Sequence, residues 1–235
     1  MKTNALLSAT ALFAGSLLAA DASPQDDITA AARKLGEQVN YSWKTTVVVP
    51  EGSRFRPGPT EGKTEKDGFT HLTVNIGDSP MQAVLKGDKA AISNPEGGWQ
   101  SLAELDTSEG PARFKAMAVR NFKAPAAQAA ELVAGVKELT KDGDAWSGEL
   151  SDDAAKTLLT FGRRPSGDGP SVSNAKGSIK FWLKDGALTK YETKVSGKVT
   201  FNDNERDVDR TSTTEIKDIG TTKVEVPEEA KKKLG

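Results

Sequence analysis

The side chains that could perform catalysis are few, and they form no recognisable catalytic group. The chain of 235 residues has one histidine, His71, and no cysteine. Thiol chemistry is therefore excluded, and no Ser-His-Asp arrangement can be assigned a geometry. In its alternating segment His71 lies opposite the apolar residues Leu72, Val74 and Ile76, which predicts an exposed strand histidine. The aspartates and glutamates are many, but nothing singles out a catalytic pair. We predict that the protein is not an enzyme.

Two further patterns could bind an ion or a phosphate, and neither fits. Acidic residues recur at every second position in Asp203, Glu205, Asp207 and Asp209, and carboxylate oxygens can bind calcium. An EF-hand loop needs glycine at its sixth position and glutamate at its twelfth, where this chain has Val208 and Thr214. The glycines of 167–170 match no phosphate-binding spacing, and Pro170 removes an amide. We therefore expect a solvated hairpin here, and no metal or cofactor.

Composition indicates an exported protein without nucleic-acid partners. The formal net charge is -1, with 28% charged and 36% hydrophobic residues, which describes a soluble chain of one or at most two domains. Residues 1–22 read as a secretory signal, with Lys2, an apolar stretch over 5–20 and the small-x-small site Ala20-Asp21-Ala22. We expect residues 23–235 to form a single domain, periplasmic or otherwise exported. No cysteine is present for lipid attachment, and no transmembrane segment is expected in the mature chain.

Long alternating strands dominate the last part of the chain. Ile179, Phe181 and Leu183 share one face, and so do the odd positions Ala187, Tyr191, Val195, Val199 and Phe201. Matching these faces across a hairpin predicts a three-residue loop at 184–186, with a left-handed Gly186, that pairs Phe181 with Thr189. The same reasoning predicts a second hairpin around 218–220.

The preceding segments alternate between strand and helix patterns. Ser23-Pro24 begins a helix to about residue 38, and 41–49, 60–66, 69–76, 81–85 and 90–92 read as strands. Helical spacing follows Pro111, Pro125 and Ser151, a hairpin surrounds Asp142-Gly143, and 163–174 reads as a loop.

This order of elements resembles the LolA/LppX-like superfamily of periplasmic lipoprotein carriers. The resemblance rests on the strand and turn at 181–186 and on the ending, 213–220 followed by 224–230. Residues 54–57, Arg-Phe-Arg-Pro, are similar in composition to an Arg-Pro segment of that family. The resemblance implies an α+β fold with a strongly curved antiparallel sheet, an incomplete barrel, and helices that cover its concave face. In that family, the space between sheet and helices receives acyl chains.

The resemblance and the strand faces together suggest a binding site. The expected hydrophobic cleft is lined by Trp43, Val47, Leu72, Val74, Ile76, Phe181 and Tyr191. The predicted function is non-catalytic binding or carriage of lipid, lipoprotein acyl chains or another apolar ligand. Its partners would be a lipid or an acylated protein, and possibly an envelope protein. The alternative is an envelope interaction or sensor module whose core is filled by its own side chains. An open apolar cavity favours the carrier, and a packed core favours the module.

Overall fold

The fold is one open antiparallel sheet with helices packed on it. The computed structural model describes residues 23–53, 56–76, 79–106, 111–160, 170–201 and 203–235. The strands are β1 (Asn40–Val48), β2 (Thr60–Glu65), β3 (Thr70–Ile76), β4 (Ser79–Lys86), β5 (Lys89–Ser93), β6 (Trp99–Ser101), β7 (Thr140–Asp142), β8 (Ala145–Glu149), β9 (Ser171–Lys184), β10 (Ala187–Phe201) and β11 (Asn204–Lys217). The helices are α1 (Pro24–Gly36), α2 (Leu102–Asp106), α3 (Pro111–Arg120), α4 (Pro125–Ala134), α5 (Asp152–Leu159) and α6 (Glu228–Lys233).

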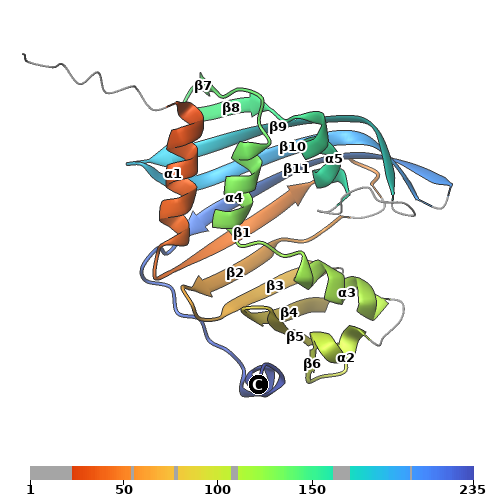
Figure 1. The fold of residues 1–235 in the computed structure, drawn as a ribbon. Coiled ribbons are helices and arrows are strands. Elements are labelled where there is room, and N and C mark those ends of the chain that lie inside the picture. Colours follow the sequence, from red (N-terminus) through yellow and green to blue (C-terminus); the bar gives the residue numbers. More distant parts are fainter. Residues whose placement is uncertain (1–22, 54–55, 77–78, 107–110, 161–169, 202) are drawn as a thin grey trace, which may run out of the picture.

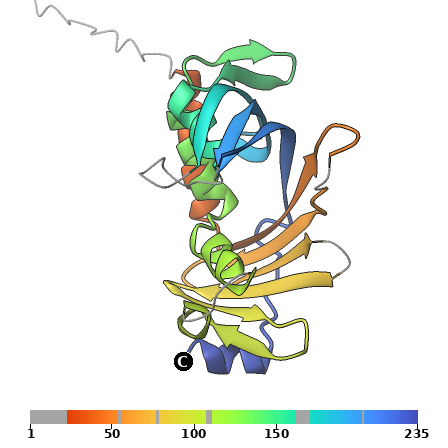
Figure 2. The same cartoon turned by 90° about the vertical axis from the view of Figure 1, so that its right-hand side faces the viewer.

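The eleven strands form a single curved sheet in the order β6-β5-β4-β3-β2-β1-β11-β10-β9-β8-β7, and the sheet does not close into a barrel. Figure 2 shows the sheet bending around the helices, and Figure 1 shows α1 and α4 side by side across the strands β8 to β11. The predicted α+β class with a curved antiparallel sheet is confirmed.

The first helix begins where the sequence predicted, because its cap is complete. The Ser23 hydroxyl accepts a hydrogen bond from the Asp26 amide at 3.2 Å, and the Asp26 carboxylate accepts one from the Ser23 amide at 3.2 Å. Both bonds satisfy amides that have no partner within the helix. Pro24 occupies the first turn, where a missing amide costs nothing.

The hairpin of β9 and β10 corrects the predicted loop. Its turn has two residues, Asp185 and Gly186, with φ of 52° and 70°. A bulge between Leu188 and Lys190 then shifts the register, so that Phe181 lies opposite Tyr191. The prediction assumed regular pairing after the turn, whereas one extra residue in β10 brings the apolar faces together.

The predicted second hairpin around 218–220 is wrong. β11 pairs with β10 along one edge and with β1 along the other, and Ile216 lies opposite Trp43 on β1. Both edges of β11 are therefore occupied, and the following residues cannot add a strand to it. The chain turns at 218–221 and then crosses the other face of the sheet, where the Glu225 carbonyl lies 2.9 Å from Nδ1 of His71. The expected loop at 163–174 also ends early, since β9 begins at Ser171.

The two faces of the sheet are covered unequally. On the concave face one apolar cluster joins the sheet to side chains of α1, α2, α3, α4 and α5. On the convex face a smaller cluster joins β4 and β5 to the C-terminal α6, and its buried members are Val84, Ala91, Ala230 and Leu234. Helix α6 was not predicted from the sequence. The concave face is therefore the one on which the predicted cleft residues must be judged.

Candidate functional site

Three of the predicted cleft residues lie beneath α1 and α4. We call this region the covered end, defined by Tyr41, Trp43, Phe181 and Tyr191. The exposed fractions of these side chains are 3%, 4%, 0% and 2%, in that order. Register places them on one face, because Trp43 lies opposite Ile216 while Phe181 lies opposite Tyr191. Leu72, on β3, is also buried, at 2%.

Aromatic contacts hold the covered end together. The Trp43 ring lies 5.8 Å from Tyr41 and stacks at 6.0 Å on Phe122, which follows α3. Phe181 and Tyr191 lie 6.4 Å apart, and the Tyr191 hydroxyl donates to the Gln128 side chain of α4 at 2.5 Å. Such ring pairs stabilise a core by more than their buried area alone. These side chains are therefore packed against the helices.

The Trp43 indole needs a glycine on the neighbouring strand. Gly62 lies opposite Trp43 in the register of β1 and β2. A Cβ atom at Gly62 would come within 2.0 Å of the indole. Any other residue would displace the ring, so Gly62 fixes where Trp43 lies.

Burial keeps both tyrosines of the covered end neutral. Desolvation raises the pKa of Tyr41 to about 12, although a backbone hydrogen bond from Ala126 of α4 opposes the shift. Desolvation also raises the pKa of Tyr191, against a hydrogen bond with Thr214 that lowers it. A phenol in such surroundings stays protonated and serves as a hydrogen-bond donor rather than as a base. The two hydroxyls of the covered end accordingly remain protonated.

Two other predicted residues, Val47 and Val74, lie on the same face. The register places Val74 level with Tyr191, through the pairs of Thr60 with Thr45 and of Thr45 with Thr214, whereas Val47 lies one pair further along β1. Both are half-buried, and they are joined by three further half-buried valines, Val172, Val199 and Val208. We call Val47, Val172, Val199 and Val208, which lie on the four neighbouring strands β1, β9, β10 and β11, the valine end. Gly197 packs under Leu159 of α5, because a Cβ atom added at Gly197 would lie only 2.8 Å from that side chain. Val199, two residues further along β10, therefore lies beyond this helix. Figure 1 shows β9, β10 and β11 continuing past α5 there.

Register confirms that the five valines share the concave face. Val172 pairs with Val199, Val208 pairs with Gly197, and Val47 lies opposite Ser212, which in turn lies opposite Thr193 on β10. Val74 pairs with the buried Met81. The last predicted residue, Ile76, ends β3, and its side chain lies outside the described residues.

Sequence reasoning missed part of the valine end. Val172 lies within the segment that was expected to be a loop. The register of β9 shifts near Asn174, which is left-handed with a φ of 54°, and this shift turns Val172 toward the concave side. Val208 lies among acidic residues that occupy every second position. This alternation could have identified it, because it places Val208 on the face opposite the acidic side chains. Val199 had been placed on the correct face.

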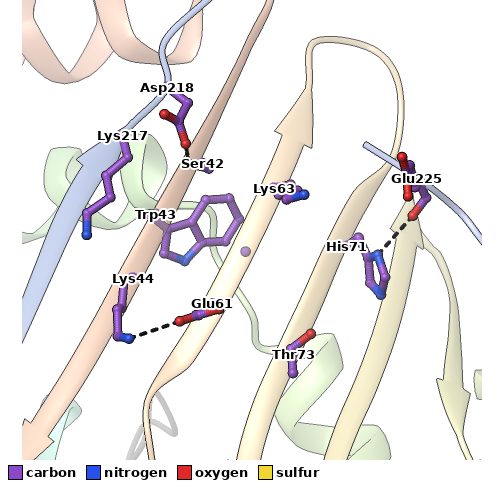
Figure 3. A pocket seen from close by; sticks show the side chains of 11 residues that line it. Ser42, Trp43, Lys44, Glu61, Lys63, His71, Thr73, Lys217, Asp218 and Glu225 are labelled. Carbon is purple, nitrogen blue, oxygen red and sulfur yellow. Dashed lines mark hydrogen bonds and ion pairs between the residues drawn. The ribbon is translucent and has the colours of Figure 1, made fainter. Parts of the chain in front are cut away.

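A polar hollow lies on the convex face, behind Trp43. It has a volume of about 540 Å³ and is lined by Ser42, Trp43, Lys44, Glu61, Gly62, Lys63, His71, Thr73, Lys217, Asp218 and Glu225. Figure 3 shows one ion pair in it, between Lys44 of β1 and Glu61 of β2. Lys44 lies 3.0 Å from Glu61, and the Ser42 hydroxyl donates to Asp218 at 2.6 Å. With its walls charged and largely paired, this hollow does not suit an apolar ligand.

His71 lines this hollow. It is half-buried, with Nδ1 2.9 Å from the Glu225 carbonyl and Nε2 3.3 Å from the Gln82 side chain. The prediction placed it on the correct face but expected more exposure, because the C-terminal segment that covers it was not foreseen. Within the described ranges, no cluster of histidine and acidic residues could hold a metal ion.

A second hollow lies at the edge of the concave face. It has a volume of about 310 Å³ between β5, β6 and the helices α2 and α3, and its lining includes Ile92, Leu105, Ala112 and Lys115. Its floor is apolar, since Ile92 and Leu105 are buried.

Comparison with known proteins finds similar structures but no similar sequence. No protein-family model matches the chain, and no curated protein matches its sequence. Among solved structures, the lipoprotein LppX of Mycobacterium tuberculosis matches with 10% identity and a TM-score of 0.47, covering 86% of this chain and 97% of LppX. LprF from Mycobacterium bovis matches with 11% identity and a TM-score of 0.48, covering 89% of this chain and 100% of LprF. None of the described helices is long and apolar enough to cross a membrane.

Proposed function

We propose that this chain is an exported, non-catalytic protein that binds a lipid, a lipoprotein acyl chain or another apolar ligand at the valine end. One observation carries the proposal. Four half-buried valines from the neighbouring strands β1, β9, β10 and β11 face the same concave side, and three of them, Val172, Val199 and Val208, pack against the apolar cluster that fills the covered end. Apolar side chains gathered from so many strands and left half-exposed are typical of a binding surface.

Binding would work by burial of apolar surface. Each methylene of an acyl chain that leaves water contributes about 0.8 kcal/mol. Part of one chain therefore suffices for micromolar affinity once the costs of association are met. Phe181 and Tyr191 are already packed under α1 and α4, so they support the site while the ligand lies on the valines. Release needs no covalent step.

Adjacent valines on β1 provide a matched test. Val47 is half-buried on the concave face, whereas Val48 is 66% exposed on the other face. We expect Val47→Asp to weaken binding of a fluorescent fatty-acyl probe by about tenfold or more, because an unpaired carboxylate in an apolar site is costly. Val48→Asp should leave the affinity within about twofold of the original protein. Circular dichroism and urea unfolding show whether both variants keep their fold. Equal effects of the two substitutions would contradict the proposal.

The packing of the covered end favours a second candidate, an envelope interaction or sensor module with a self-filled core. Trp43, Phe181 and Tyr191 were predicted to line a cleft, and all three are buried. Native mass spectrometry of protein purified from an envelope extract separates the two candidates. Co-purified lipid supports the binder. No lipid, together with no probe binding at tens of micromolar, supports the module.

A further inference from the structure

The second hollow is small, and its floor is apolar. Its volume of about 310 Å³ lies at the lower end of the range for small-molecule pockets, about 300 to 1,000 Å³. The buried Ile92 and Leu105 form the floor, and the half-buried Ala112 of α3 also lines it. In the sheet β4, β3 and β2 separate β5 from β1, and Figure 1 shows α2 and α3 beside β5 and β6, apart from α5. The hollow is therefore a different place on the concave face from the valine end.

Two side-chain amides in the lining of the hollow have hydrogen-bond donors to spare. Gln100 lies opposite Ile92 in the register of β5 and β6, so it shares the concave face. It is half-buried, and its carboxamide forms no hydrogen bond within the described part of the chain. The side-chain oxygen of Asn94 accepts a hydrogen bond from the Glu96 amide at 3.1 Å. Because a backbone N–H can only donate, the NH2 group of Asn94 remains available to a ligand.

Lys115 adds a positive charge to the same lining. It lies on α3, is half-buried, and forms no ion pair with a described residue. The two acids of α2 pair with other cations, since Asp106 pairs with Arg120 and Glu104 lies 2.6 Å from Lys233. None of the described lining residues is acidic. The hollow therefore presents one ammonium group and two amides beside an apolar floor.

We propose that the second hollow binds a small monocarboxylate with an apolar body, a single ring or a short chain. The body lies on Ile92 and Leu105, while the carboxylate binds the ammonium of Lys115 and accepts a hydrogen bond from the amide of Gln100. A hydrogen bond from a cation to a carboxylate is stronger than a neutral one, and partial exclusion of water strengthens the attraction further. A cationic ligand finds no acid in the described lining. This site goes beyond the proposed function, because it lies on other strands and its volume suits a small molecule rather than a lipid.

Three probes that share a phenyl ring test the role of charge: phenylacetate, phenylacetamide and phenylethylammonium. Each is added to the full-length mature protein while the methyl NMR signals of Ile92 and Leu105 are followed. We expect phenylacetate to bind about tenfold more tightly than phenylacetamide, as one charge-assisted hydrogen bond would give, and the cation to bind most weakly. Lys115→Gln should reduce the preference for the acid to about twofold or less. Lys194→Gln, at an exposed lysine of β10, is the matched control and should leave the preference unchanged.

A substitution that fills the hollow tests its location. Ala112→Leu should remove binding of all three probes, because the larger side chain occupies the space beside Ile92 and Leu105. Circular dichroism checks the fold, and Ala112→Met replaces this variant if it does not fold. Binding of the fluorescent fatty-acyl probe at the valine end should persist in the filled variant.

Several results would overturn this inference. They are equal binding of the acid and the amide, a preference for the acid that survives Lys115→Gln, and probe binding that persists in the filled variant. The absence of any shift of the Ile92 and Leu105 signals at tens of millimolar would also overturn it. None of these results bears on the valine end, which the fatty-acyl probe tests separately. Loss of fatty-acyl binding in the folded Ala112→Leu protein would show that the two places form one site, contrary to this inference.

Discussion

The two ends of the concave face share their strands but differ in what covers them. Trp43 and Val47 both come from β1, and Tyr191 and Val199 both come from β10. At the covered end α1 and α4 pack on large aromatic side chains, while at the valine end the same alternation presents half-buried valines, of which Val172 and Val199 lie beyond α5. Strand periodicity therefore decides which face a residue occupies, and the placement of the helices decides whether that residue becomes core or surface. This difference is why we assign ligand binding to one end only.

Removal of a large side chain should give the largest difference in the free energy of unfolding between the two ends. Phe181→Ala should lower the free energy of unfolding by about 3 to 5 kcal/mol, because it opens a cavity in a fully buried site. Val199→Ala, at the half-buried end, should cost about 1 kcal/mol or less. Urea denaturation measures both values. Similar costs at the two positions would mean that the two ends are packed alike.

A smaller decrease in the free energy of unfolding is expected from a substitution that crowds the covered end. Gly62→Ala places a Cβ atom in the Trp43 indole, so we expect a destabilisation of about 3 kcal/mol and a shift in tryptophan fluorescence. Gly36→Ala serves as the control, since its Cβ would lie at an ordinary 3.5 Å from Ala126. That substitution should be neutral or stabilise by up to about 1 kcal/mol. An unchanged Gly62→Ala protein would show that the ring is free to move.

The smallest effect should come from the turn that aligns both ends. Gly186 has a φ of 70°, where a β-branched residue is strained, so Gly186→Val should cost about 1 to 2 kcal/mol. Asp185→Asn should be nearly neutral, because asparagine tolerates the left-handed conformation. Unfolding midpoints give both numbers, and a loss below a few tenths of a kcal/mol for Gly186→Val would argue against a left-handed conformation at Gly186.

Much of the fold was readable from local patterns. The cap at Ser23, the turn at Asp67-Gly68 and the strand faces of β1 and β3 follow from neighbouring residues, and the structure contains each of them. The errors concern register and edges. The bulge after Leu188 and the pairing of β11 with β1 depend on contacts between distant segments, which periodicity does not reveal.

The candidate site shows the same limit. Alternation placed Trp43, Phe181 and Tyr191 on the concave face together with Val47 and Val74, and register confirms that face. Alternation alone could not distinguish the residues that α4 covers from those that α4 leaves half-exposed.

The most direct test of the account locates a bound acyl chain on the protein. We would record methyl NMR spectra while adding a fatty acid that carries a spin label near the end of its chain. The account predicts that methyl signals of Val172, Val199 and Val208 broaden first, while those of Leu188, which is buried near the opposite end of β10, change little. Uniform broadening, broadening confined to the convex Val48, or no broadening at all would contradict ligand binding at the valine end.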